Sequence, residues 1–151
     1  MDSCWDFFMD LSIKRLHPDA ILPAYSKPGD SGFDLYCVED VSIKPGASAI
    51  LPTGLAMAVP DGFELQIRMR SGSSLRTPLM IANAPGTIDS GYRGEIGIIV
   101  RNIGASSWLV HKGERIAQGV IAPVVRASFK EVATLPDSIR GSHGFGSTGV
   151  D

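Results

Sequence analysis

The stretch SAILPTGLAMAVPDGFELQIRM, residues 48–69, consists of short apolar runs separated by turn residues. Its two runs, 48–59 and 63–69, are joined by Pro-Asp-Gly, a combination typical of a tight turn. The second run alternates apolar and polar residues, as a strand does when one face packs on a core and the other meets water. This stretch therefore predicts β-strands rather than helices.

The same pattern extends along most of the chain. Further turn triplets, KPG, KPG, APG and HKG, stand at 27–29, 44–46, 84–86 and 111–113, and further β-rich runs stand at 10–16, 33–38, 95–100 and 119–125. The best short helix candidate, GSSLRTPL at 72–79, is interrupted by its proline. Short strands with turns about every 8–12 residues predict an all-β fold, a jelly-roll-like β-sandwich or barrel.

Composition narrows the class of protein. The chain has 151 residues, 44% hydrophobic and 20% charged, which is typical of one globular domain, here expected over residues 1–139. A net charge of −2 provides no field that would attract nucleic acid. The two cysteines lack CxxC spacing and are expected to be unpaired thiols, as in proteins of a reducing cytosol. No apolar run approaches the roughly 20 residues that span a bilayer, and the aspartates near the N-terminus do not fit an export signal. A cytoplasmic location is expected.

The two ends of the chain differ from the rest. Residues 1–10 read as an extension without an interpretable role. Residues 140–151, RGSHGFGSTGVD, are rich in glycine and contain one large apolar side chain, so they predict a flexible C-terminal arm, either a simple tail or a lid that orders over a ligand. The glycines of this arm are spaced like a dinucleotide fingerprint, but too few residues follow for the required helix.

Five short glycine-bearing segments combine backbone access with reactive side chains: GFDL at 32–35, RSGSS at 70–74, GTIDSGYRG at 86–94, GERIAQ at 113–118 and RGSHGFGSTG at 140–149. P-loop, G-x-S-x-G and HExxH motifs are absent from the sequence, and its three histidines lack metal-ligand spacing. Taken alone, the third segment is either a hairpin turn or a turn that holds a catalytic base. It places Asp89 three residues before Tyr92.

Together, in this order and spacing, the five segments resemble the five motifs of the trimeric dUTP diphosphatases (dUTPases), over about residues 10–149. The resemblance implies a jelly-roll subunit and a homotrimer with three sites at subunit boundaries. It also implies Mg²⁺-dependent hydrolysis of dUTP to dUMP and pyrophosphate, which keeps uracil out of DNA and supplies dUMP for thymidylate synthesis.

The resemblance also assigns roles to single residues. Asp89 corresponds to the general base that activates the attacking water, and Tyr92 to the tyrosine that packs beneath the deoxyribose and leaves no room for a 2′-hydroxyl. The uracil-reading hairpin corresponds to Asn83 with the backbone around Gly86 and Ile88.

A second group of residues corresponds to the triphosphate and metal site. Arg70, Ser71 and Gly72 match the phosphate-binding second motif, and Gln118 matches a phosphate contact in the fourth. Asp34 matches the acidic position near the water shell of Mg²⁺, with no direct protein ligand expected. In the arm, Phe145 would stack on uracil, and the γ-phosphate would be held by Arg140, Ser147 and Thr148. Apart from the resemblance, a triphosphate is bound by guanidinium groups and backbone N–H groups, and the arginines and glycine-rich loops supply both. Met69 stands where the family usually has proline.

Two other functions remain open at this stage. A dCTP deaminase of the same fold carries its catalytic glutamate on the strand after the third motif, where this chain has Ile99, and Glu95 lies too close to the turn to replace it. A non-catalytic β-fold binding module would keep the fold without chemistry, yet both the motif aspartate and the arm are present. Ammonia release from dCTP and pyrophosphate release from dUTP distinguish these alternatives.

Overall fold

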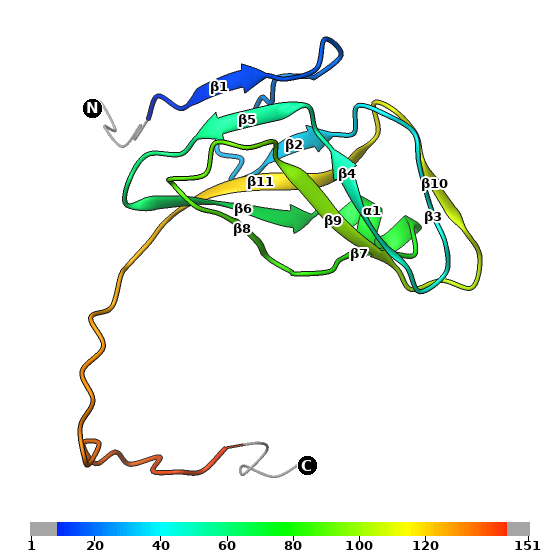
Figure 1. Cartoon of the computed structure of the whole chain (residues 1–151). Helices are drawn as coiled ribbons and strands as arrows, with labels where there is room; N and C mark the ends of the chain where they lie inside the picture. Colours follow the sequence, from blue (N-terminus) through cyan, green and yellow to red (C-terminus); the bar gives the residue numbers. More distant parts are fainter. Residues whose placement is uncertain (1–8, 145–151) are drawn as a thin grey trace.

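The computed structural model describes residues 9–144, and its regular secondary structure consists almost entirely of short β-strands (Figure 1). The all-β prediction is confirmed. In chain order the elements are β1 (Ser12–Arg15), β2 (Phe33–Tyr36), β3 (Val41–Ile43), β4 (Ser48–Pro52), β5 (Leu55–Ala58), β6 (Phe63–Met69), α1 (Ser71–Arg76), β7 (Leu79–Ile81), β8 (Gly86–Ile88), β9 (Gly97–Asn102), β10 (Trp108–Val110) and β11 (Arg115–Pro123).

The strands form antiparallel sheets in which neighbours are often far apart in sequence. One sheet has the order β2-β11-β6-β8 and a second has the order β4-β9-β7, while β1 pairs with β5 and β10 pairs with β3. The last strand, β11, lies between β2 and β6, so the end of the chain completes a sheet begun near its start. These packed antiparallel sheets with long-range strand pairing match the predicted jelly-roll-like β-sandwich.

The core lies between the sheets and follows the alternation seen in the sequence. In β6, Leu65 and Ile67 are buried while Arg68 is exposed, and in β9 the buried Ile98 and Val100 flank an outward-facing Ile99. Burying each such side chain stabilises the fold by about 1.5–3 kcal/mol. These core contacts fix the strands that carry the candidate site residues.

Two details differ from a simple reading of the runs. The apolar run 48–59 breaks into β4 and β5 at Gly54, whose φ of +66° suits glycine, and a Cβ there would meet the His17 Cβ at 2.7 Å. The helix candidate at 72–79 is α1, which ends at Arg76, ahead of Pro78, because a proline disfavours helical geometry in the residue before it. Strands β3, β7 and β10 have three residues each, too few to give a clear sequence pattern.

After β11 the chain leaves the body as an extended segment, drawn in orange to red in Figure 1. Within residues 124–144 the structure contains no helix or strand, and large apolar side chains stand in solvent: Phe129 is 96% exposed. The exposed segment thus begins well before residue 140, where composition alone set the start of the arm. Residues 9–144 include no helix that is both long and apolar enough to cross a membrane.

Candidate active site

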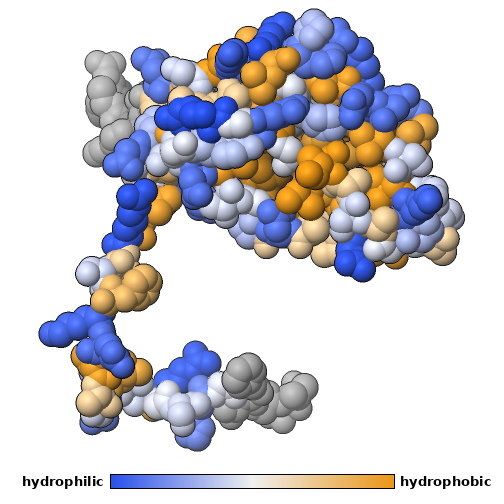
Figure 2. Space-filling model, in the orientation of Figure 1, coloured by the Kyte–Doolittle hydropathy of each residue, from blue (hydrophilic) through white to orange (hydrophobic). Residues whose placement is uncertain are grey.

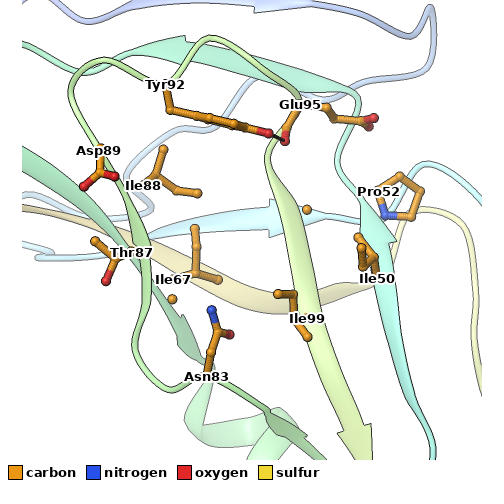
Figure 3. A pocket seen from close by; sticks show the side chains of 12 residues that line it. Ile50, Pro52, Ile67, Asn83, Thr87, Ile88, Asp89, Tyr92, Glu95 and Ile99 are labelled. Carbon is orange, nitrogen blue, oxygen red and sulfur yellow. Dashed lines mark hydrogen bonds between the residues drawn. The ribbon is translucent and has the colours of Figure 1, made fainter.

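A cavity of about 470 Å³ opens between residues 83–95, the segment around β8 that was predicted as a hairpin and keeps that name here, and the sheet formed by β4 and β9 (Figure 3). One wall is apolar and includes Ile50, Pro52 and Ile99. The opposite wall carries polar groups of the hairpin, including Asn83 and Asp89. An apolar cavity with a few polar groups on one side is typical of a site that binds a small organic molecule.

The hairpin presents its backbone to this cavity. Strand β8 pairs with β6 on one side, and within residues 9–144 no strand pairs with its other edge. Gly86 permits this arrangement, because a Cβ there would lie 3.0 Å from the Ile67 Cβ and 3.6 Å from the Asn83 Nδ2. The free N–H and C=O groups of an edge strand can therefore bind the polar edge of a ligand.

The turn after β8 directs Asp89 and Tyr92 into the same cavity. The Tyr92 backbone N–H donates to the Asp89 carbonyl at 3.0 Å, which closes the turn. The Asp89 side chain is exposed and lines the cavity. The Tyr92 hydroxyl donates to the Glu95 carbonyl at 2.9 Å, and the ring lies so close to Gly94 that a Cβ there would overlap the hydroxyl. The aromatic ring is thus held in one orientation beside a carboxylate.

A second hollow, of about 360 Å³, gathers the segments 32–35, 70–74 and 113–118. At its wall the Asp34 carboxylate joins two arginines: Arg70 Nε lies 2.7 Å from Oδ1 and Arg115 Nη1 lies 3.1 Å from Oδ2. Arg70 also donates through Nη1 to the Arg115 carbonyl at 3.0 Å. One carboxylate thus orients two guanidinium groups at the hollow, and guanidinium N–H groups suit an anionic ligand.

Backbone groups and an amide complete this second hollow. Ser71 and Gly72 lie at the start of α1, where backbone N–H groups have no partner within the helix. Gln118 donates through Nε2 to the Met69 carbonyl at 3.2 Å. Its Oε1 packs directly against Gly32, where any Cβ would overlap it. The hollow is therefore suited to oxyanions such as phosphate.

The structure divides the predicted residues into two groups, since the two hollows share no lining residue. The first cavity contains the predicted base, tyrosine and uracil-reading residues: Asn83, Gly86, Ile88, Asp89 and Tyr92. The second contains the predicted phosphate and metal residues: Asp34, Arg70, Ser71, Gly72 and Gln118.

Of the predicted arm residues the structure describes Arg140, which lines neither hollow. Arg140 lies in the exposed segment, where its Nε donates to the His143 carbonyl at 2.9 Å. Phe145, Ser147 and Thr148 lie outside the described residues.

Sequence reasoning missed Arg115, although it stands inside the fourth segment. Its role is visible only in the fold, because the Asp34 that it binds is 81 positions away. It also missed the apolar wall of the first cavity, where Ile50 of β4 lies opposite Ile99 of β9. In the sequence both isoleucines fit the pattern of an ordinary strand, and nothing in that pattern indicates that they border a cavity.

Among residues 9–144 no group of three or more His, Cys, Asp or Glu side chains could hold a metal ion by itself. Both carboxylate oxygens of Asp34 are paired with arginines. Mg²⁺ commonly binds through phosphate oxygens and water with only one or two protein carboxylates. The residues present therefore fit an ion that arrives with a phosphate ligand rather than a permanent protein cage.

Comparison with known proteins gives close relatives along nearly the whole chain. The sequence profile of the dUTPase family matches residues 18–149. The deoxyuridine 5′-triphosphate nucleotidohydrolase of Wolinella succinogenes is 49% identical over 141 residues, which cover 93% of this chain and 95% of the relative. The protein of the same name from Gloeothece citriformis is 51% identical over 142 residues, which cover 94% and 98%.

Solved structures agree with the sequence comparison. The dUTPase of Staphylococcus bacteriophage 80alpha with dUPNHPP superposes with a TM-score of 0.87 at 32% identity, covering 93% of this chain and 99% of that chain. A mutant dUTPase from phage phi11 of S. aureus, described for its coordination of a structural Mg(II) ion, has a TM-score of 0.78 at 26% identity. That match covers 83% of this chain and 98% of the phage chain.

Proposed function

Because the chain belongs to the dUTPase family, we propose that it hydrolyses dUTP to dUMP and pyrophosphate, with the hairpin cavity as its nucleoside site. The observation that carries this function is the meeting of Asp89 and Tyr92 beside the free edge of β8 in one cavity. A base, an aromatic ring and an open backbone edge are the groups that hydrolysis of a pyrimidine nucleotide requires.

Asp89 acts as the general base. Its exposed carboxylate can accept a proton from a water molecule aligned with the α-phosphorus, and general-base assistance of this kind contributes about 10²–10⁴ in rate. The oxygen of that water bonds to phosphorus, the bond to the bridging oxygen of the β-phosphate breaks, and pyrophosphate leaves.

The hairpin selects the nucleoside. Uracil is bound by Asn83 and the backbone of Gly86 and Ile88, so cytosine leaves those groups without partners, a mismatch that can cost about 10⁴-fold. The ring of Tyr92 packs beneath the deoxyribose and excludes a 2′-hydroxyl. Support for this role comes from its fixed orientation, through the hydrogen bond to Glu95 and the contact with Gly94.

The second hollow binds the triphosphate. Arg70, Ser71, Gly72 and Gln118 supply guanidinium, hydroxyl, backbone and amide donors, and Arg115 joins them as a further cation. Asp34 orients both arginines and would lie near the water shell of a bound Mg²⁺. When bound, Mg²⁺ neutralises charge on the phosphate oxygens. Support for this assignment comes from the two guanidinium groups that Asp34 orients at the hollow.

The active unit is a homotrimer in which a site is shared between subunits. A single chain keeps its nucleoside and phosphate groups in two hollows without a common residue, so one subunit would supply the hairpin and another the phosphate groups. Leu75, Met80 and Ile103, which line neither hollow, are 87%, 42% and 66% exposed and provide apolar surface that a second subunit could cover. The orange patches on the body in Figure 2 show how much apolar surface the isolated chain presents.

The C-terminal arm crosses to a neighbouring subunit and closes over the ligand. The segment that leads to the arm, from Val124 onward, carries exposed apolar side chains including Val125, Phe129 and Leu135, which a partner surface would cover. Arg140, Phe145, Ser147 and Thr148 would then contact the base and the γ-phosphate.

Pyrophosphate release from dUTP in the presence of Mg²⁺ tests this function directly. Asp89→Asn preserves the side-chain shape but removes the basic group, so turnover should fall by about 10²–10⁴ while an unhydrolysable dUTP analogue still binds. Asp61→Asn, in the exposed turn before β6, is the matched control and should retain full turnover. Retention of more than about a tenth of the turnover by Asp89→Asn would rule out the base role.

Measurements with dCTP and dUTP distinguish the other two functions. Release of ammonia from dCTP would indicate a deaminase, and binding of dUTP without pyrophosphate release would indicate a binding module. The trimer is tested by light scattering at micromolar protein concentration, where a monomer mass would contradict both the assembly and the shared site.

A further inference from the structure

Within the described residues, one side-chain hydrogen bond joins the loop after β8, residues 89–95, to another segment. Glu95 accepts a hydrogen bond through Oε1 from the Gly54 backbone N–H, at 2.8 Å. Gly54 lies in the buried turn between β4 and β5, packed against His17, Ala20 and Val38. The Glu95 carboxylate therefore holds the loop to a part of the fold that has little freedom to move.

Every other hydrogen bond of this loop is internal. Tyr92 N–H donates to Asp89, Arg93 Nη1 donates to the carbonyls of Ser90 and Tyr92, and the Tyr92 hydroxyl donates to the Glu95 carbonyl. Within residues 9–144, the bond between Glu95 and Gly54 is the one hydrogen bond that joins 89–95 to another segment. The loop is thus a compact unit attached through β8 at one end and through residue 95 at the other.

Residue 95 also sets the orientation of the tyrosine. Its side chain binds the Gly54 turn, while its backbone carbonyl accepts from the Tyr92 hydroxyl at 2.9 Å, a bond drawn as a dashed line in Figure 3. The next residue, Ile96, pairs with the same turn through its N–H to the Leu55 carbonyl at 2.8 Å. One residue therefore links the tyrosine ring to the β4–β5 turn.

We propose that Glu95 is a positioning residue for Tyr92 and thereby determines the discrimination between deoxyribonucleotides and ribonucleotides. The inference rests on the proposed dUTP hydrolysis, in which the Tyr92 ring packs beneath the sugar. Asp89 follows directly after β8, which its pairing with β6 holds in place, whereas Tyr92 lies further along the loop. Loss of the Glu95 carboxylate therefore displaces the tyrosine more than the base, and it admits a 2′-hydroxyl before it abolishes catalysis.

The test compares Glu95→Ala with Glu95→Gln, using kcat and KM for dUTP and for UTP. In Glu95→Ala the buried Gly54 N–H has no acceptor and the loop loses its tether, so the dUTP/UTP ratio of kcat/KM should fall at least about tenfold, with a smaller change in kcat for dUTP. In Glu95→Gln the amide Oε1 still accepts from Gly54, so the ratio should stay within about threefold of the wild type.

A variant in the hydrophobic core distinguishes a loss of Tyr92 positioning from a general loss of protein stability. Val110→Ala, at the one buried position of β10, should lower the melting temperature without changing a residue of the loop, so its dUTP/UTP ratio should remain unchanged. Glu95→Asp keeps the charge but is one methylene shorter. It should also lower the ratio, and it provides the test if Glu95→Ala fails to fold.

The outcomes separate this inference from the proposed function. A wild-type enzyme that hydrolyses dUTP, combined with an unchanged ratio in Glu95→Ala or Glu95→Asp, would overturn the role of Glu95 and leave the function standing. A wild-type protein without dUTP turnover would overturn the function itself.

Discussion

Gly32→Ala is expected to disable the phosphate hollow while leaving the fold intact. The Gly32 backbone is outside the positive-φ region, so alanine fits the local conformation. Its Cβ, however, would overlap Oε1 of Gln118 and lie 3.2 Å from the Gln118 Cδ. Because the overlapping atoms belong to the end of a flexible side chain, the amide should move rather than the backbone.

The size of the effect follows from this contact. Ordinary van der Waals contact requires roughly 3.5 Å between heavy atoms, so the amide must shift by about 1 Å or rotate away. Its 3.2 Å hydrogen bond to the Met69 carbonyl would be lost, at a cost of about 0.5–1.5 kcal/mol of stability. Misplacement of a binding group by about 1 Å can reduce activity by about 10²-fold, so we expect kcat/KM for dUTP to fall by about 10–100-fold.

A double-mutant cycle with Gln118→Ala tests this reasoning through steady-state kinetics and urea unfolding. If the loss arises from the clash, adding Gly32→Ala to Gln118→Ala should have almost no further effect on kcat/KM, because only the Gln118 Cβ at 3.6 Å remains nearby. Additive losses in the double variant, or a Gly32→Ala enzyme within about threefold of the wild type, would refute it.

Other variants probe the remaining parts of the molecule. Tyr92→Ala should raise UTP hydrolysis relative to dUTP, and an unchanged ratio in parallel assays would exclude a role at the sugar. Truncation after Ile139 should leave the trimer intact by light scattering but depress turnover sharply, because the γ-phosphate contacts and the lid are lost together. Burial raises the pKa of the Cys37 thiol above its ordinary value of 9.0, so the stability contributed by the neutral thiol is present below that pH and decreases as pH rises through the raised value. Urea unfolding from about pH 7 to pH 10 should therefore show a smaller alkaline loss in Cys37→Ser than in the wild type.

The local alternation of apolar and polar residues was sufficient to predict many of the strands. The alternation in 63–69 corresponds to β6, residue for residue, and the interrupted run at 72–79 overlaps the short helix α1. The turn that holds Asp89 and Tyr92 was visible in the sequence, and the resemblance to the dUTPase motifs added Asn83; the structure places all three in one cavity. Such features depend on neighbours in the chain, so residue order alone determines them.

The remaining features of the site depend on the pairing of strands that lie far apart in the sequence. Asp34 meets Arg115 only because β2 and β11 are adjacent in one sheet, and the partners of a strand depend on how all the sheets pack together rather than on its own sequence. The division of the site into two hollows has the same origin, since β6 connects the hairpin on one side with the phosphate segments on the other. Glu95 illustrates the limit most clearly: in sequence it is a polar residue after a turn, and its connection to Gly54, 41 positions away, exists only once β4, β5 and β9 are packed.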